Sequence, residues 1–216
     1  MNFESAFSFQ FQDPDWVKKI LIAALCTLIP VAGGLFLLGW TLEIARRVIK
    51  DEPSVLPDLE LSENIVRGFQ AAVISLVYMI PIFLLALPIG VVSGFASNSN
   101  SNLPGAIFLI VFACFGILIA IYSIFLGLLL PAAYGNFLAK GSLGAGLEFG
   151  EVFSIFKSAI GPYFMVLLGN LISGLIASLG TVVCLVGVVA TTAYGMTIYG
   201  HLIGQAYKSA VQNRAF

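Results

Sequence analysis

The sequence predicts an all-α membrane protein, a polytopic bundle of transmembrane helices. Two long stretches without Asp, Glu, Lys or Arg favour this class, residues 68–139 and 158–207. The outer face of a soluble helix carries charged residues at nearly every turn, so these stretches do not fit a soluble core. The chain is 59% hydrophobic and 10% charged over 216 residues. This suits several segments of about 20 apolar residues, each crossing a bilayer core of about 30 Å.

Residues 1–16 precede the first apolar stretch. We expect them to form an N-terminal interfacial segment ahead of a single membrane-embedded domain, residues 17–216. Phenylalanine alternates here with polar or small residues, at Phe3, Phe7, Phe9 and Phe11. The alternation favours an extended segment or one that lies at the lipid headgroups, where aromatic rings are stable. Asp13 and Pro14 then fit the start of a helix, as N-cap and first helical residue.

The first apolar stretch, 17–47, is too long for one straight crossing, because about 31 residues of helix span about 46 Å. Pro30 removes a backbone hydrogen bond, and a pair of glycines soon after it weakens a continuing helix. We therefore expect two segments, about 17–29 and 34–49, the first of them short or re-entrant. Five clear spans result: about 34–49, 67–95, 105–138, 157–180 and 183–207.

The basic residues predict the orientation. If both ends of 17–49 lie on one side, all ten Lys and Arg residues fall on that side, and basic residues gather on the cytoplasmic side of a membrane. Both termini are then cytoplasmic, and the polar, uncharged loop 97–102 is outside. The ten residues are Lys18, Lys19, Arg46, Arg47, Lys50, Arg67, Lys140, Lys157, Lys208 and Arg214.

A short internal repeat is visible between residues 59–63 (Leu-Glu-Leu-Ser-Glu) and residues 147–151 (Leu-Glu-Phe-Gly-Glu). Each copy follows a membrane segment that ends in basic residues and precedes an apolar helix. A parallel duplication of this kind is common in transporters; a chance match of five positions is the alternative.

Glu43 is the only acid inside an expected membrane segment, and ionisable residues there are functional candidates by default. Arg46 and Arg47 follow it by three and four residues, a spacing that allows a local ion pair on one helix face. Two interpretations stay open: structural pairing, or a role in transport or partner binding.

Gly200 and Gly204 lie four residues apart near the end of the last apolar stretch. Small residues at this spacing let membrane helices pack closely, so we expect this face to meet another helix, within the chain or in an oligomer. His201 beside it has three interpretations: a hydrogen bond across helices, a pigment or metal ligand, or a proton relay. We expect Gly204→Leu to lower the melting temperature more than Leu202→Ala does.

The remaining residues predict neither an enzyme nor a cofactor or metal site. No nucleophile–base pair, phosphate loop or zinc motif appears, and the three cysteines are isolated in apolar stretches. The acids of the two repeat copies fit helix N-termini, where they complement the dipole, better than catalytic pairs. A net charge of −1 argues against nucleic acid as a partner.

Several segments carry a family resemblance: 11–20, 28–31, Gly39 with Glu43 and Arg46-Arg47, 147–153, and 201–207. In these the chain resembles the DUF4013 family, prokaryotic multi-pass membrane proteins of unknown function. The likeness extends over nearly the whole chain and is most specific in the opening block. It implies a protein of the bacterial or archaeal cytoplasmic membrane, and it supplies no activity, cofactor or catalytic residue.

We expect a non-catalytic scaffold or accessory subunit, in contact with the lipid bilayer and with a membrane-protein partner or a second copy of itself. The alternative is a small transporter or lipid-handling protein, which predicts a polar cavity near the break at Pro30. An intramembrane enzyme ranks third and predicts acids that converge on His201 in one pocket.

Overall fold

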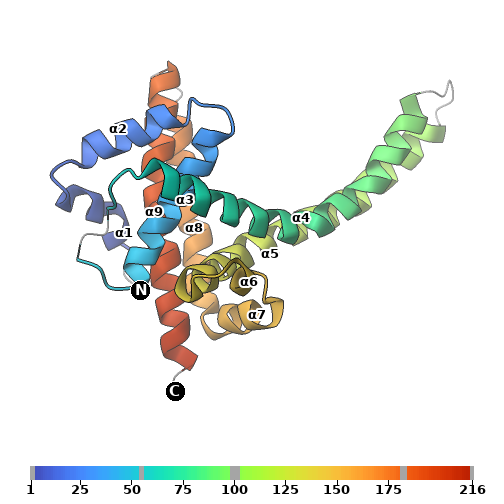
Figure 1. Cartoon of the computed structure of the whole chain (residues 1–216). Helices are drawn as coiled ribbons and strands as arrows, with labels where there is room; N and C mark the ends of the chain where they lie inside the picture. Colours follow the sequence, from blue (N-terminus) through green and yellow to red (C-terminus); the bar gives the residue numbers. More distant parts are fainter. Residues whose placement is uncertain (1–2, 54–55, 98–102, 181–183, 215–216) are drawn as a thin grey trace. The chain divides into compact units, whose positions relative to one another are not determined.

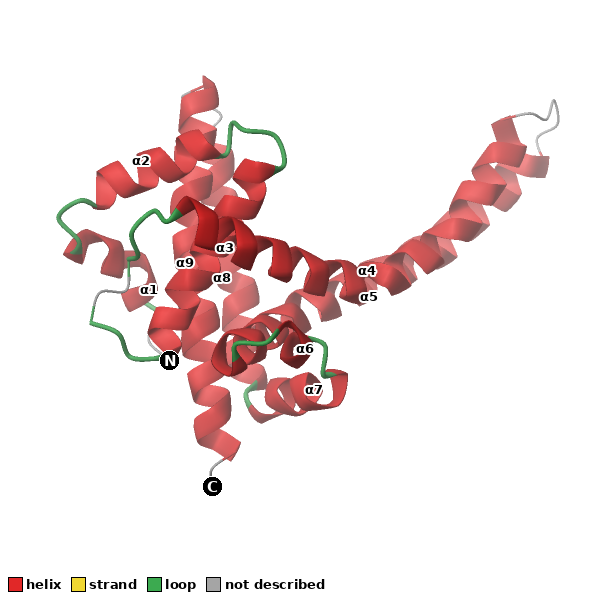
Figure 2. Cartoon of the chain, in the orientation of Figure 1, coloured by secondary structure: helices red, strands yellow, loops and turns green. Residues whose placement is uncertain are grey.

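The computed structural model describes residues 3–53, 56–97, 103–180 and 184–214, and every element in these ranges is helical (Figures 1 and 2). The predicted all-α class is therefore confirmed. The elements are α1 (Ser5–Ser8), η1 (Phe9–Gln12), α2 (Trp16–Cys26), α3 (Ala32–Ile49), α4 (Leu61–Ser97), α5 (Leu103–Lys140), α6 (Leu143–Gly146), α7 (Phe149–Ser158), α8 (Ile160–Leu179) and α9 (Cys184–Arg214).

Within the described residues, three helices are long and apolar enough to cross a membrane: α4 over Leu61–Phe95, α5 over Ile107–Lys140 and α8 over Ile160–Ser178. This is consistent with a membrane location. The prediction of five clear spans is wrong in number. The stretch expected at 34–49 is α3, which carries three charged residues and is largely buried in protein. The stretch expected at 183–207 lies in α9, which is rich in Gly, Thr and Tyr.

The predicted break at Pro30 is confirmed. Helix α2 ends at Cys26 and α3 begins at Ala32. Val31 has a φ of 64°, a conformation that reverses the chain and that β-branched residues rarely adopt. A side chain at Gly33 would lie 2.7 Å from the Cα of Thr27, so only glycine permits this close turn. Helix α2, with 11 residues, spans about 16 Å, roughly half a bilayer core.

The N-terminal segment is helical, so the extended alternative is wrong. Two short helices, α1 and η1, pack along α9. Gln10 donates a hydrogen bond to Thr197 at 2.7 Å, and the Tyr194 hydroxyl donates to the carbonyl of Phe7 at 3.0 Å. Packing of Phe9 and Gln10 against α9 explains why the alternating pattern does not produce a strand. The interfacial position of 1–16 and the single domain 17–216 stay predictions.

Helix α9 is central to the first compact unit, Met1–Ile74 with Leu128–Phe216. It packs against α8, α3, α2, α7 and α1, and Figure 1 shows α8 and α9 side by side. Helix α3 also meets the start of α4 closely. A side chain at Gly39 would collide with the backbone of Asn64, and one at Gly68 would collide with the carbonyl of Leu35.

The second compact unit, Ser75–Gly127, consists of the adjoining parts of α4 and α5. The two helices run antiparallel (Figure 1), and the Tyr122 hydroxyl donates a hydrogen bond to the carbonyl of Tyr78 at 2.9 Å. Many large apolar side chains are exposed on both helices. Examples are Ile80, Phe83 and Leu87 on α4 and Leu109, Ile117 and Ile121 on α5.

Candidate functional site

A network of charges surrounds Glu43 on α3. Its carboxylate is 8% exposed and accepts hydrogen bonds from Arg46 at 2.5 and 2.7 Å and from Arg47 at 3.1 Å. Arg67 reaches it from the first turns of α4 at 3.0 Å. The ion pairs expected from the spacing are therefore present. The contact of Arg67 with Glu43 was not predicted, because a contact between two helices leaves no signal in the local spacing of residues.

Glu52, just beyond α3, extends this network. It lies 3.4 Å from Arg46 and 3.6 Å from Arg47. Each guanidinium group carries several N–H donors in a fixed plane. Together the guanidinium groups of Arg46, Arg47 and Arg67 saturate the lone pairs of the Glu43 carboxylate. A carboxylate held in this way is a poor general base, and it fixes the end of α3 against the start of α4.

The face of Gly200 and Gly204 contacts α3, as the spacing predicted. A Cβ at Gly200 would collide with the carbonyl oxygen of Thr41, and one at Gly204 would lie 2.6 Å from the Cβ of Val48 and 2.8 Å from the oxygen of Ala45. The two glycines thus let the backbones of α3 and α9 approach each other. The partner is within the chain.

His201 is buried, and Phe9 of η1 stacks on its ring with centroids 4.5 Å apart. Its Nδ1 lies 3.0 Å from the amide nitrogen of Gln205, one turn later on the same helix. An amide nitrogen only donates, so Nδ1 accepts and the ring proton is on Nε2. The hydrogen bond across helices is not present among the described residues; the contact across elements is the stacked ring of Phe9.

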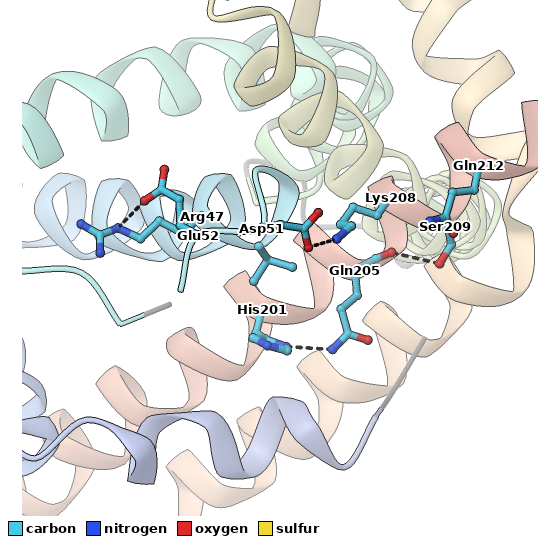
Figure 3. Close-up of a pocket in the computed structure, with 9 residues that line it drawn as sticks. Arg47, Asp51, Glu52, His201, Gln205, Lys208, Ser209 and Gln212 are labelled. Atoms are coloured by element: carbon cyan, nitrogen blue, oxygen red, sulfur yellow. Dashed lines mark hydrogen bonds and ion pairs between the residues drawn. The ribbon is translucent and has the colours of Figure 1, made fainter. Parts of the chain in front are cut away.

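A cavity of about 380 Å³ opens between the end of α3 and the last turns of α9 (Figure 3). One wall is a single face of α9, formed by His201, Gln205, Lys208, Ser209 and Gln212. The other wall is the end of α3 and the turn after it, formed by Arg47, Val48, Asp51 and Glu52.

Lys208 and Asp51 form an ion pair across this cavity (Figure 3). Asp51 has a φ of 55°, a left-handed conformation that Asp tolerates better than most residues, and this turn ends α3. Sequence reasoning found His201 and Arg47 but missed the rest of the cavity. The available signal was the spacing on α9, where polar residues follow His201 after four, seven, eight and eleven positions and so share one helix face.

The other predicted residues do not converge on this cavity. Pro30 lies at the opposite end of α3. The acids of the second repeat copy are engaged elsewhere: Glu148 pairs with Lys140 at 2.8 Å and Glu151 with Arg214 at 2.8 Å. Among the described residues, no group of three or more His, Cys, Asp or Glu could hold a metal ion.

The fold and the site together define a class: an all-helical protein with apolar helices of membrane-spanning length and a charged cluster at the end of a buried helix. Within that class, the chain belongs to the DUF4013 family, described as proteins of unknown function, whose model matches residues 22–196. No curated protein and no solved structure gives a match.

Proposed function

We propose that this protein is a non-catalytic scaffold or accessory subunit of the prokaryotic cytoplasmic membrane, which binds transmembrane helices of a partner protein through its second unit. The observation that carries the proposal is the uncovered apolar surface of the α4–α5 pair within Ser75–Gly127.

The length of this unit fits one bilayer. Residues 75–97 of α4 and 103–127 of α5 are about 23 and 25 residues long, which corresponds to about 35 to 38 Å of helix and exceeds a hydrocarbon core of about 30 Å only slightly. Two helices in lipid expose most of their side chains. Surface of this extent is suited to packing against further helices.

One face of α4 is shaped for such packing. Phe83, Leu87, Gly90 and Gly94 follow each other at helical spacing and are exposed. A Cβ built on Gly90 would meet no atom within 4 Å. Between helices in lipid, van der Waals contact replaces the hydrophobic effect, and glycines four residues apart allow backbones to approach. A transmembrane helix of a partner fits this face.

The transporter alternative has less support. It predicts a polar cavity near the break at Pro30, whereas the polar cavity described above lies at the other end of α3. An enzyme would need a reactive group with an available base. The carboxylate nearest to that description, Glu43, is bound by three arginines.

Affinity purification in mild detergent tests the proposal. We expect one membrane protein to co-purify in fixed ratio with the wild type and to be lost in Gly90→Leu. The matched control is Ala113→Leu, which also adds bulk at an exposed small residue, but on α5. Equal recovery of the partner with both variants would refute docking on this face. A change in particle size alone would identify a second copy of the chain as the occupant.

The proposed orientation places both termini in the cytoplasm and loop 97–102 outside, because all ten basic residues then share one side. Cysteine labelling tests it. A cysteine in place of Ser99, which lies outside the described residues, should react with an impermeant reagent in intact cells. Reaction only after the membrane is opened would reverse the orientation.

A further inference from the structure

The cavity between α3 and α9 contains equal numbers of opposite charges. Lys208 and Arg47 are positive, and Asp51 and Glu52 are negative. Lys208 pairs with Asp51, and Arg47 lies 3.6 Å from Glu52. A ligand with a single charge would leave one group of this set without compensation. A ligand with one positive and one negative charge would provide a new partner for each member of the Lys208–Asp51 pair and leave no net charge in the cavity.

Hydrogen-bond donors on α9 extend the positive side of the cavity. With Nδ1 of His201 occupied by Gln205, the proton on Nε2 has no acceptor among the described residues. The ring is only 7% exposed and lines the cavity. A ring N–H that lines the cavity and has no protein acceptor can donate to a ligand oxygen. Lys208, about two turns further along the same face of α9, supplies additional donors.

The cavity lies where two apolar helices become charged. Along α3 the first charged residue is Glu43, and along α9 it is Lys208. A side chain at Gly204 would touch Val48, and Lys208 pairs with Asp51, so the charged last turns of α3 and α9 lie at the same height. In a membrane protein this is the level of the lipid headgroups.

We propose that this cavity binds a zwitterionic phosphate–ammonium group, with the phosphate at Lys208 and His201 and the ammonium at Asp51 and Glu52. Its volume of about 380 Å³ falls within the range of small-molecule sites, roughly 300 to 1,000 Å³. The same chemistry occurs in the headgroup of phosphatidylethanolamine and in soluble phosphoethanolamine. The site is independent of the α4 face proposed for partner binding.

Native mass spectrometry of the full chain in mild detergent tests the site. The protein is titrated with phosphatidylethanolamine and with phosphatidylglycerol of the same acyl chains, which has the phosphate but no ammonium. We expect about fivefold tighter binding of phosphatidylethanolamine, the effect of one additional ion pair of about 1 kcal/mol. Equal binding of the two lipids would overturn the proposal.

Two variants connect the preference to the cavity. Lys208→Gln should reduce the preference to less than about twofold, whereas Arg214→Gln, a basic residue of the same helix outside the cavity, should retain it. The exchange Asp51→Lys with Lys208→Asp keeps an ion pair at this position but reverses the two charges, so it should also lose the preference. A wild-type preference in Lys208→Gln or in the exchanged variant would refute the assignment.

Competition identifies the source of the group. Soluble phosphoethanolamine that displaces the lipid at comparable concentration would assign a free metabolite to the cavity. Binding of the lipid without such displacement would assign the membrane headgroup. Absence of binding for both compounds would overturn the proposal.

Discussion

The contact between α3 and α9 depends on two glycines, and the approach is closer at Gly200 than at Gly204. A Cβ at Gly200 collides with the carbonyl oxygen of Thr41, which is backbone and does not rotate away. A Cβ at Gly204 would lie 2.6 Å from the side chain of Val48, against about 3.5 to 4.0 Å for two carbons at optimal separation. Gly200→Ala therefore requires α3 and α9 to move apart.

The magnitude follows from two opposing effects. Overpacking of a well-packed contact costs about 1 to 3 kcal/mol, whereas alanine gains about 1 kcal/mol over glycine in helix propensity. We expect Gly200→Ala to lower the unfolding free energy by about 0 to 2 kcal/mol, or the melting temperature by at most roughly 8 °C for a chain of this size. Relative to a glycine-to-alanine change without a collision, the loss is about 1 to 3 kcal/mol.

Thermal melting in detergent measures this effect. The control is Gly174→Ala on α8, where the added Cβ meets no atom within 4 Å, so only the propensity gain remains and melting should be unchanged or slightly higher. Leu202→Ala is unsuitable as a mild comparison, because Leu202 is fully buried and its loss costs about 2 to 5 kcal/mol. Equal melting of Gly200→Ala and Gly174→Ala would refute the close-contact argument.

Three further predictions concern other contacts. Glu43→Gln leaves three arginines without their shared carboxylate and should lower the unfolding free energy by about 3 kcal/mol. The control Glu63→Gln changes an exposed side chain and should alter the unfolding free energy by less than about 0.5 kcal/mol. Similar melting temperatures of the two variants would contradict this prediction. The hydrogen bond from Arg214 lowers the pKa of Glu151, so this carboxylate stabilises the fold above its ordinary pKa of 4.5 and loses that effect as the pH falls through the lowered value. The melting difference between wild type and Glu151→Gln should shrink from about pH 6 to about pH 3, and a constant difference would exclude the pair as its source. Tyr122→Phe removes a hydrogen bond to a carbonyl of α4 and should cost about 0.5 to 1.5 kcal/mol; unchanged melting would show that the second unit does not depend on it.

The features that local chemistry determines could be predicted from the sequence. The apolar stretch 17–47 is too long for one crossing and contains Pro30 with a glycine pair soon after it, so the break near Pro30 followed from these neighbouring residues. Proline alone does not decide this, because α4 continues through Pro81 and Pro88 and α5 continues through Pro131. The ion pairs of Glu43 with Arg46 and Arg47 followed from their spacing on one helix face. The face of Gly200 and Gly204 followed from the same kind of argument.

The features that depend on contacts between distant segments could not be predicted. Hydropathy shows that α9 is apolar, but not that its apolar residues face other helices. Leu202 meets α8 at Gly169, and Arg67 joins Glu43 from another helix. The N-terminal phenylalanines alternate as in a strand, yet their segment is helical because α9 provides a surface for it. The cavity needs α3 and α9 together, and neither sequence segment indicates the other.

The register of α3 and α9 has a consequence for biosynthesis. Thr41 lies beside Gly200, Val48 beside Gly204 and Asp51 beside Lys208, so the two helices run in the same direction although about 150 residues separate them. The ribosome releases α3 first, and the surface that will meet α9 has no neighbour until the C-terminal helix is made. The N-terminal helices α1 and η1 also pack against α9, so they cannot reach their final packing before α9 is made. The earliest part of this chain therefore reaches its final packing only when the last part is complete.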